Sequence, residues 1–92
     1  MNYLHSEHDL EEGDVVQVVL DTRANVLLMD TTNFDHYKSG QNYHYFGGHA
    51  KVSPVRLIPP RSGKWHVVVN LGGDSGTVKA GASVIKKTVA AR

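Results

Sequence analysis

Hydrophobic residues along the chain recur mostly at every second position, in short runs separated by glycine, proline, asparagine and aspartate. A period of two is typical of strands with one buried face, and interruptions of this composition are typical of turns. The pattern predicts strands over residues 2–8, 14–21, 24–30, 43–51, 53–58, 64–71 and 77–85. The sequence therefore predicts an all-β domain.

Two of these strands carry the clearest pattern. In 14–21, alternate valines and a leucine fall on one face, and a hairpin with 24–30 is expected across the short Thr22-Arg23 connection. In 64–71, Trp65 begins one apolar face and His66 lies on the other. The unbroken valine run that follows indicates a central strand, because such a strand is covered on both faces.

The stretch TTNFDHYKSG breaks the alternation. Thr32 and Asp35 form a weak capping box, Phe34 and Tyr37 share a face, and Gly40 suits a C-terminal cap. We expect one or two helical turns here, closing an end of the sheets.

Seven short strands in one chain of this length favour a compact two-layer β-sandwich, jelly-roll-like, with one short helical turn. The alternative is a small closed β-barrel. Residues 1–92 are expected to form a single domain, in which 85–92 is a frayed basic tail.

Composition excludes several classes of function. The net charge is +1, so no overall field draws nucleic acid or an anionic membrane to the chain. The absence of cysteine excludes disulfides, thiolate metal sites and a cysteine nucleophile. The first residues lack the pattern of a signal peptide, and no apolar run approaches the roughly 20 residues that span a bilayer. We expect a cytoplasmic protein without a membrane segment.

The stretch YHYFGGHAK concentrates candidate chemistry. Our first interpretation is a bent strand with outward aromatics, bulged at Gly47-Gly48. Such a bulge would bring His44 and His49 to the same side. The alternative is a shallow binding surface formed by these histidines with Tyr43 and Tyr45.

The sequence gives less support to a metal site or to a protease site. His5 and His8 point apart at a spacing of three in a strand, and no recognised ligand pattern fixes a geometry, so we predict no metal and no cofactor. The tetrapeptide Gly-Asp-Ser-Gly at 73–76 is similar to the sequence around a trypsin-like serine, but here it occupies a hairpin loop. We interpret it as a turn.

Five blocks, GDVV, NVxLMD, YxGG, SPVRL and GxWHVVVxLGG, together resemble a small bacterial family known only as a domain of unknown function, number eighteen-eighty-three. The likeness extends from about Tyr3 to Val84. It implies a compact all-β fold that stands alone in some bacteria and is attached to TIR-type signalling domains in others. It implies no catalytic residues. Within the blocks, Arg56 and His66 are expected to point away from the core without a packing role.

The sequence favours a non-catalytic binding or sensing module for a small polar ligand or a protein partner, present as a monomer or weak homo-oligomer. An attachment to signalling domains fits recognition better than catalysis. One alternative is a small histidine-dependent or metal-dependent hydrolase, and another is a structural subunit that associates through strand edges. The candidate binding residues are Tyr43, His44, Tyr45, His49, Arg56 and His66.

Overall fold

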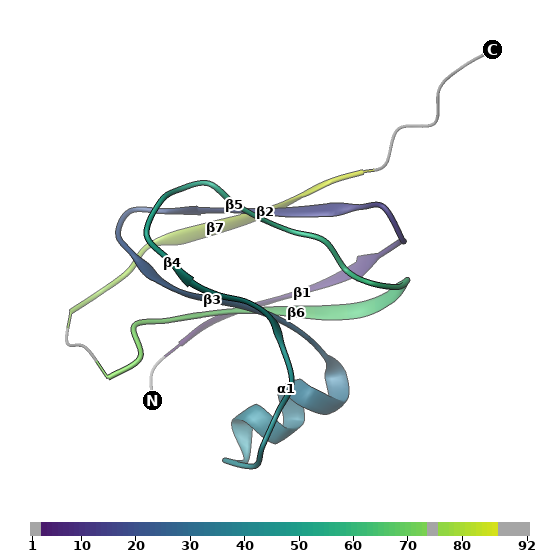
Figure 1. Ribbon diagram of the computed structural model, residues 1–92, viewed down its shortest axis with the longest axis horizontal. Coiled ribbons are helices and arrows are strands. Elements are labelled where there is room, and N and C mark those ends of the chain that lie inside the picture. The colour runs from purple at the N-terminus through teal and green to yellow at the C-terminus, as the bar shows by residue number, and fades with distance from the viewer. Residues whose placement is uncertain (1–2, 74–75, 87–92) are drawn as a thin grey trace.

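The computed structural model describes residues 3–73 and 76–86. The expected strands and helix are all present (Figure 1). They are β1 (Leu4–Leu10), β2 (Val15–Leu20), β3 (Ala24–Asp30), α1 (Thr31–Lys38), β4 (Phe46–Ala50), β5 (Val55–Leu57), β6 (Gly63–Asn70) and β7 (Ala80–Ile85). The expected tail beyond residue 86 and the centre of the Gly-Asp-Ser-Gly turn lie outside the described residues.

The strands form two antiparallel sheets. Sheet A has the order β1-β6-β3-β4, and sheet B has the order β5-β2-β7. Figure 1 shows the sheets as two layers, with α1 on the side of sheet A away from sheet B. The predicted all-β sandwich is confirmed. The alternative of a barrel is wrong, because the two sheets remain separate in the part of the chain that the structure describes.

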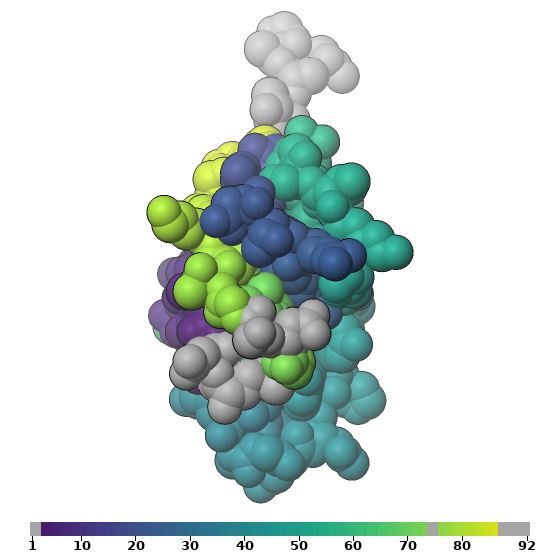
Figure 2. Space-filling view, turned by 90° about the vertical axis from the view of Figure 1, so that its left-hand side faces the viewer, coloured from purple at the N-terminus to yellow at the C-terminus, as the bar shows by residue number. Residues whose placement is uncertain are grey.

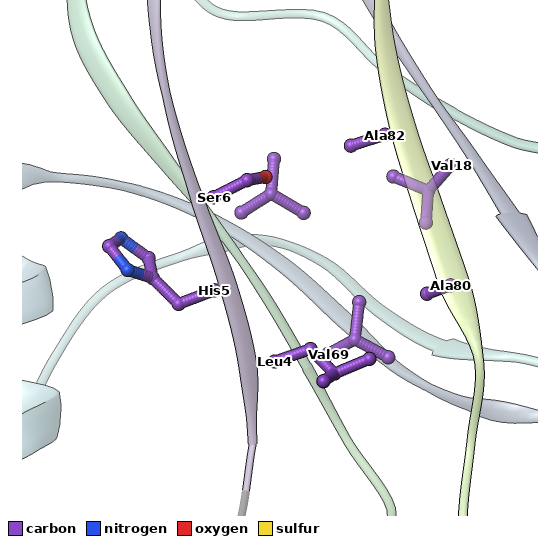
Figure 3. Close-up of a pocket in the computed structure, with 8 residues that line it drawn as sticks. Leu4, His5, Ser6, Val18, Val69, Ala80 and Ala82 are labelled. Atoms are coloured by element: carbon purple, nitrogen blue, oxygen red, sulfur yellow. The ribbon is translucent and has the colours of Figure 1, made fainter.

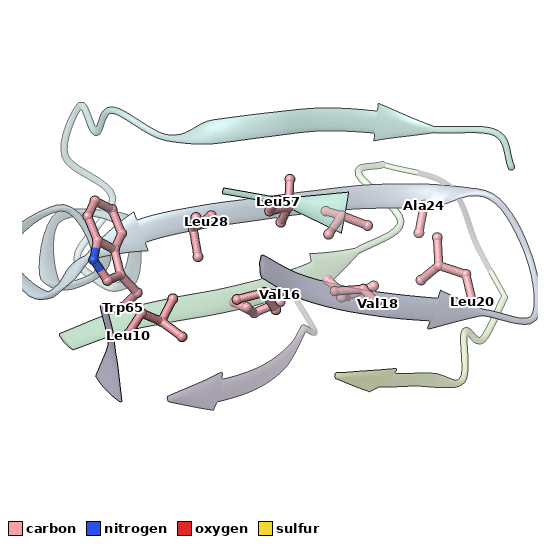
Figure 4. Close-up of a cluster of buried hydrophobic side chains, with 11 residues drawn as sticks. Leu10, Val16, Val18, Leu20, Ala24, Leu28, Leu57 and Trp65 are labelled. Carbon is pink, nitrogen blue, oxygen red and sulfur yellow. The ribbon is translucent and has the colours of Figure 1, made fainter. Parts of the chain in front are cut away.

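The main hydrophobic core lies between the two sheets (Figure 4). Strand alternation builds it: on β2, Val16 and Val18 are fully buried while Val19 is exposed. Trp65 on β6 closes one end of this core, and its indole Nε1 donates to the Arg61 carbonyl oxygen at 3.1 Å. The buried residues of the core are Leu10, Val16, Val18, Leu20, Ala24, Val26, Leu28, Leu57, Trp65, Val67 and Val69.

The central strands β3 and β6 are buried on both faces, which explains their continuous apolar runs. The second face of sheet A carries Leu27, Met29 and Val68, and all three pack against Phe34 of α1. Helix α1 was expected to close an end of the sheets. It covers the outer face of sheet A instead, and Figure 2 shows it extending beyond the sheets at the lower end of the molecule.

The expected hairpin between 14–21 and 24–30 is wrong. β2 pairs with β5 and β7 in sheet B, whereas β3 pairs with β4 and β6 in sheet A. The Thr22-Arg23 connection therefore crosses from one layer to the other. The physical reason is burial: β3 has apolar residues on both faces, and sheet A covers both, whereas the outer face of β2, with Val15, Gln17 and Val19, is only half-buried or exposed.

The N-cap of helix α1 lies two residues before Thr32, the N-cap of the expected capping box. Asp30 is the N-cap, and its Oδ1 accepts from the Asn33 amide at 2.9 Å. Gly40, with φ of +77°, ends the helix as expected: the Gln41 amide donates to the His36 carbonyl oxygen at 2.9 Å, as in a Schellman motif. No helix in residues 3–73 and 76–86 has the length and apolar character to cross a membrane.

Strand β4 begins at Phe46, so Tyr43–Tyr45 belong to the connection that follows α1. The expected bulge is wrong, because Gly47 and Gly48 pair with Leu27 and Val26 in an unbroken register. Close backbone approach explains Gly47: its φ is +106°, and a Cβ at this position would overlap the Val26 carbonyl oxygen.

Candidate functional site: a histidine pair and a row of tyrosines around helix α1

Two histidines contact each other on the outer face of sheet A, beneath α1. His66 is only 3% exposed. Its Nδ1 lies 2.8 Å from Nε2 of His5 on β1, and its Nε2 lies 2.9 Å from the hydroxyl oxygen of Thr31 at the start of α1. One imidazole nitrogen donates and the other accepts, because a single hydrogen bridges the two atoms. We call His5 and His66 the histidine pair.

Phe34 covers the histidine pair from the helix side. Its ring stacks on both imidazoles, with centroid distances of 4.1 Å to His5 and 4.5 Å to His66. The Lys38 ammonium lies 4.7 Å from the centroid of the Phe34 ring. His66 points away from Trp65 as expected. The expectation that it has no packing role is wrong, because it is buried against Phe34.

The surroundings of the histidine pair favour the neutral form of both rings, because they lower the pKa of each. Burial lowers the pKa of His66, and the neighbouring His5 lowers it further. The carboxylate of Glu7, 3.9 Å from His66 Nδ1, acts in the opposite direction. Burial is also the main reason that the pKa of His5 is lowered. Such a pair can hold a proton between two bases or pass it along the hydrogen bond.

Four tyrosines form a continuous row beside α1. The ring centroids lie 5.2 Å apart for Tyr3 and Tyr37, 5.1 Å for Tyr37 and Tyr43, and 5.7 Å for Tyr43 and Tyr45. The first two contacts are edge-to-face, which is the favourable arrangement of aromatic quadrupoles. Tyr45, at the end of the row, is 47% exposed. We call these residues the tyrosine row; Tyr3 and Tyr45 are exposed, and Tyr37 and Tyr43 are half-buried.

Side-chain amides brace the tyrosine row from the sheet. The Asn70 Nδ2 donates to the Tyr37 hydroxyl oxygen at 2.9 Å, and the Asn25 Nδ2 donates to the Asn70 Oδ1 at 2.9 Å. The Gly72 amide donates to the same Oδ1 at 2.9 Å. His49 extends the network, with its Nδ1 donating to the Asn25 Oδ1 at 3.3 Å. We call Asn25 and Asn70 the amide ladder, and it ends at the exposed imidazole of His49.

The structure brings some of the predicted site residues together and separates others. His44 is exposed beside the row, and its amide donates to Asn33 Oδ1 at 2.8 Å. Arg56 lies on sheet B, where its Nε donates to the Gln17 Oε1 at 3.1 Å, so it is not part of this face. The predicted residues on or beside the helix-covered face of sheet A are Tyr43, His44, Tyr45, His49 and His66.

Several residues of this site were not predicted from the sequence: His5 as a partner of His66, Thr31, and the amide ladder. A signal was present in KWHVVVN, where His66 and Asn70 interrupt an apolar run and are buried. A buried polar side chain needs a hydrogen-bond partner. The identity of each partner depends on strand pairing between residues that are far apart in the sequence.

The described residues do not assemble a cluster of metal ligands. In the described ranges, no three histidine, aspartate or glutamate side chains come together in a way that could hold a metal ion. A small pocket of about 90 Å³ lies between β1 and β7, and Figure 3 shows the His5 ring pointing away from it. This pocket does not join His66 to His44 or His49.

Comparison with known proteins identifies one family. The family model described as a domain of unknown function, DUF1883, matches residues 1–88. Searches of the curated proteins and of the solved structures found no match.

Proposed function

The chain belongs to the family of the domain of unknown function DUF1883, and we propose that it is a non-catalytic recognition module that binds a small polar ligand on the tyrosine row. The observation that carries this proposal is the row of four rings in mutual contact, in which Tyr37 accepts a hydrogen bond from Asn70 of the amide ladder. Rings held in place before binding lose little conformational freedom when a ligand arrives.

The groups around the row favour an uncharged ligand with one flat apolar face and several hydroxyl or amide groups, such as a sugar. Tyr43 and Tyr45 offer ring surface, and the amide ladder, which contacts the row at Tyr37, adds the polar groups of Asn25 and His49 on the same face of sheet A. Aromatic faces next to a few fixed polar groups are the usual composition of such sites. The ladder and the row contain no acidic side chain that would attract a cation.

The burial of His66 favours recognition over hydrolysis. A catalytic base must reach the proton that it removes. Phe34 stacks on both imidazoles, and His66 retains 3% exposure, so a substrate would have to displace α1 to reach His66, while the exposed His5 ring is hydrogen-bonded through its Nε2 to His66. We assign the pair to the support of α1, and thereby of Tyr37 in the row.

The proposal is tested by saturation-transfer difference NMR with a panel of simple sugars and nucleosides. We expect signal from at least one compound with the wild-type protein and with Arg56→Ala, whose side chain lies on sheet B. Tyr45→Ala removes an exposed ring and should weaken that binding about ten-fold. Binding that is unchanged by Tyr45→Ala, or the absence of signal from every compound, would contradict the proposal.

A further inference from the structure

The two sheets have four edge strands, and three of them carry features that block pairing with another strand. β5 has only three residues and follows Pro54, β4 contains Gly47 and Gly48 with positive φ, and β1 carries Glu7 and Asp9. Short length, distorted backbone and charge are the devices that protect sheet edges. Each of these three edges is therefore closed to a further strand.

Strand β7 is different. Its sequence AGASVI contains no charge and no proline, and its glycine has no positive φ. It pairs over six positions with β2, and among the described residues β2 is its sole partner in sheet B. An edge of this length without a protecting device is a template for another strand.

The hydrogen-bond pattern identifies the backbone groups at the open edge. The Asp21 amide donates to the Lys79 carbonyl oxygen at 3.1 Å, so the odd-numbered residues of β7 face β2. The alternation of an antiparallel ladder then directs the amides and carbonyls of Ala80, Ala82 and Val84 away from β2. Three residues thus present donors and acceptors along one line.

An apolar pocket lies beside the same edge. It has a volume of about 90 Å³ and opens between β1 and β7, which lie along one side of the molecule (Figures 2 and 3). The small side chains of Ala80 and Ala82 leave it unfilled, and Leu4, 43% exposed, forms its wall on β1. Its deeper lining consists of Val18, Val67 and Val69.

We propose that β7 pairs antiparallel with β7 of a second copy of this chain, in a two-fold register centred on Ala82. In this register Gly81 lies opposite Ser83 of the second copy, and Ala80 lies opposite its Val84. The Val84 side chain of each copy then reaches the pocket beside Ala80 of the other. The two B sheets join into one continuous sheet.

Charge supports a second copy as the occupant. The register places Lys79 opposite Ile85 of the second copy, so that no two like charges face each other across the axis. At the other end of β7, the Lys86 ammonium is compensated by Asp14, with Nζ 2.6 Å from Oδ2. This interface lies on sheet B and is independent of ligand binding on the tyrosine row.

The test begins with sedimentation velocity of the wild-type chain over roughly 5 to 500 µM. We expect the mass to rise from 10.1 kDa toward twice that value as concentration increases. A mass that stays at 10.1 kDa throughout overturns the proposal.

Two matched variants test the register. Gly81 and Ser83 are exposed on the outer face of β7, and a Cβ at Gly81 has no heavy atom within 4 Å. Gly81→Lys with Ser83→Lys places like charges opposite each other and should raise the dissociation constant at least about ten-fold. Gly81→Lys with Ser83→Glu places opposite charges there and should preserve the dimer. Dimerisation that persists with the double lysine variant, or fails equally with both variants, overturns the register.

Discussion

At the residue scale, a buried imidazole favours the folded state only while it is uncharged. His66 is such a residue, with hydrogen bonds to His5 and to Thr31 that use both of its ring nitrogens. Protonation of both histidines would direct two N–H groups at each other across 2.8 Å. The fold therefore depends on an acid–base state that pH can change.

This arrangement predicts a loss of stability in mild acid. The pKa of His66 in the folded protein lies below its ordinary value of 6.5, and that of His5 is lowered too. Between the folded and ordinary values the unfolded chain binds protons that the folded protein does not, so the free energy of unfolding decreases as pH falls below about 6.5. Above that pH, the contribution of the two neutral histidines to the free energy of unfolding is present in full. Urea unfolding at about pH 7.5 and pH 5 measures the difference.

Two variants assign this effect to the histidine pair. His66→Asn removes a titrating ring and should make the decrease smaller, whereas His44→Ala alters an exposed ring outside the pair and should leave it unchanged. The pKa of Asp30 is lowered chiefly by the Asn33 amide. The contribution of Asp30 to stability is therefore lost only as the pH falls to about 3.8 and below. A wild-type protein equally stable at both pH values would contradict the account.

Gly47 makes a second prediction at this scale. Alanine at this position would overlap the Val26 carbonyl oxygen and would have to adopt a φ of +106°. Gly47→Ala should therefore lower the free energy of unfolding by about 2 kcal/mol or more. Gly73→Ala is the matched control, because its Cβ meets no atom within 4 Å, and its effect should stay within about 0.5 kcal/mol. Equal effects in chemical unfolding would refute the close approach.

At the scale of elements, alternation and turn residues were enough to predict every strand and the helix. These signals were not enough to predict which strands pair with each other. The β2–β3 hairpin was expected because the connection at Thr22-Arg23 is short, yet the two strands lie in different sheets. Local pattern specifies which side chains share a face, while pairing depends on which faces compete for burial across the whole chain. The prediction of a bulge in β4 was wrong for the same reason, since the register depends on both paired strands.

At this scale, we predict the effect of removing the contacts of helix α1. Phe34 packs against the apolar outer face of sheet A and stacks on the histidine pair. Phe34→Ala should lower the free energy of unfolding by about 3 kcal/mol and admit water to His66. The pKa of His66, followed by NMR, should then rise toward 6.5. Tyr37→Phe removes only the hydroxyl that accepts from Asn70 and should cost about 1 kcal/mol. An unchanged pKa of His66 in Phe34→Ala would show that Phe34 of α1 does not shield His66 from water.

At the scale of the whole molecule, the two layers separate two surfaces. The tyrosine row and the amide ladder lie on the outer face of sheet A, and the open edge of β7 belongs to sheet B. The sequence predicted the aromatic half of the first surface through Tyr43, Tyr45 and His49. It could not predict that Arg56 lies on the other layer, because a side chain's sheet is fixed only when the strands pair.

The most direct test of the recognition surface is an amide proton–nitrogen NMR titration of the labelled protein with the compounds that bind it. The account predicts shifts that concentrate at Tyr43, Tyr45, His49 and Asn25, with little change at Arg56 and Gln17 on sheet B. Shifts confined to sheet B, or spread evenly over the molecule, would contradict a binding site on the tyrosine row.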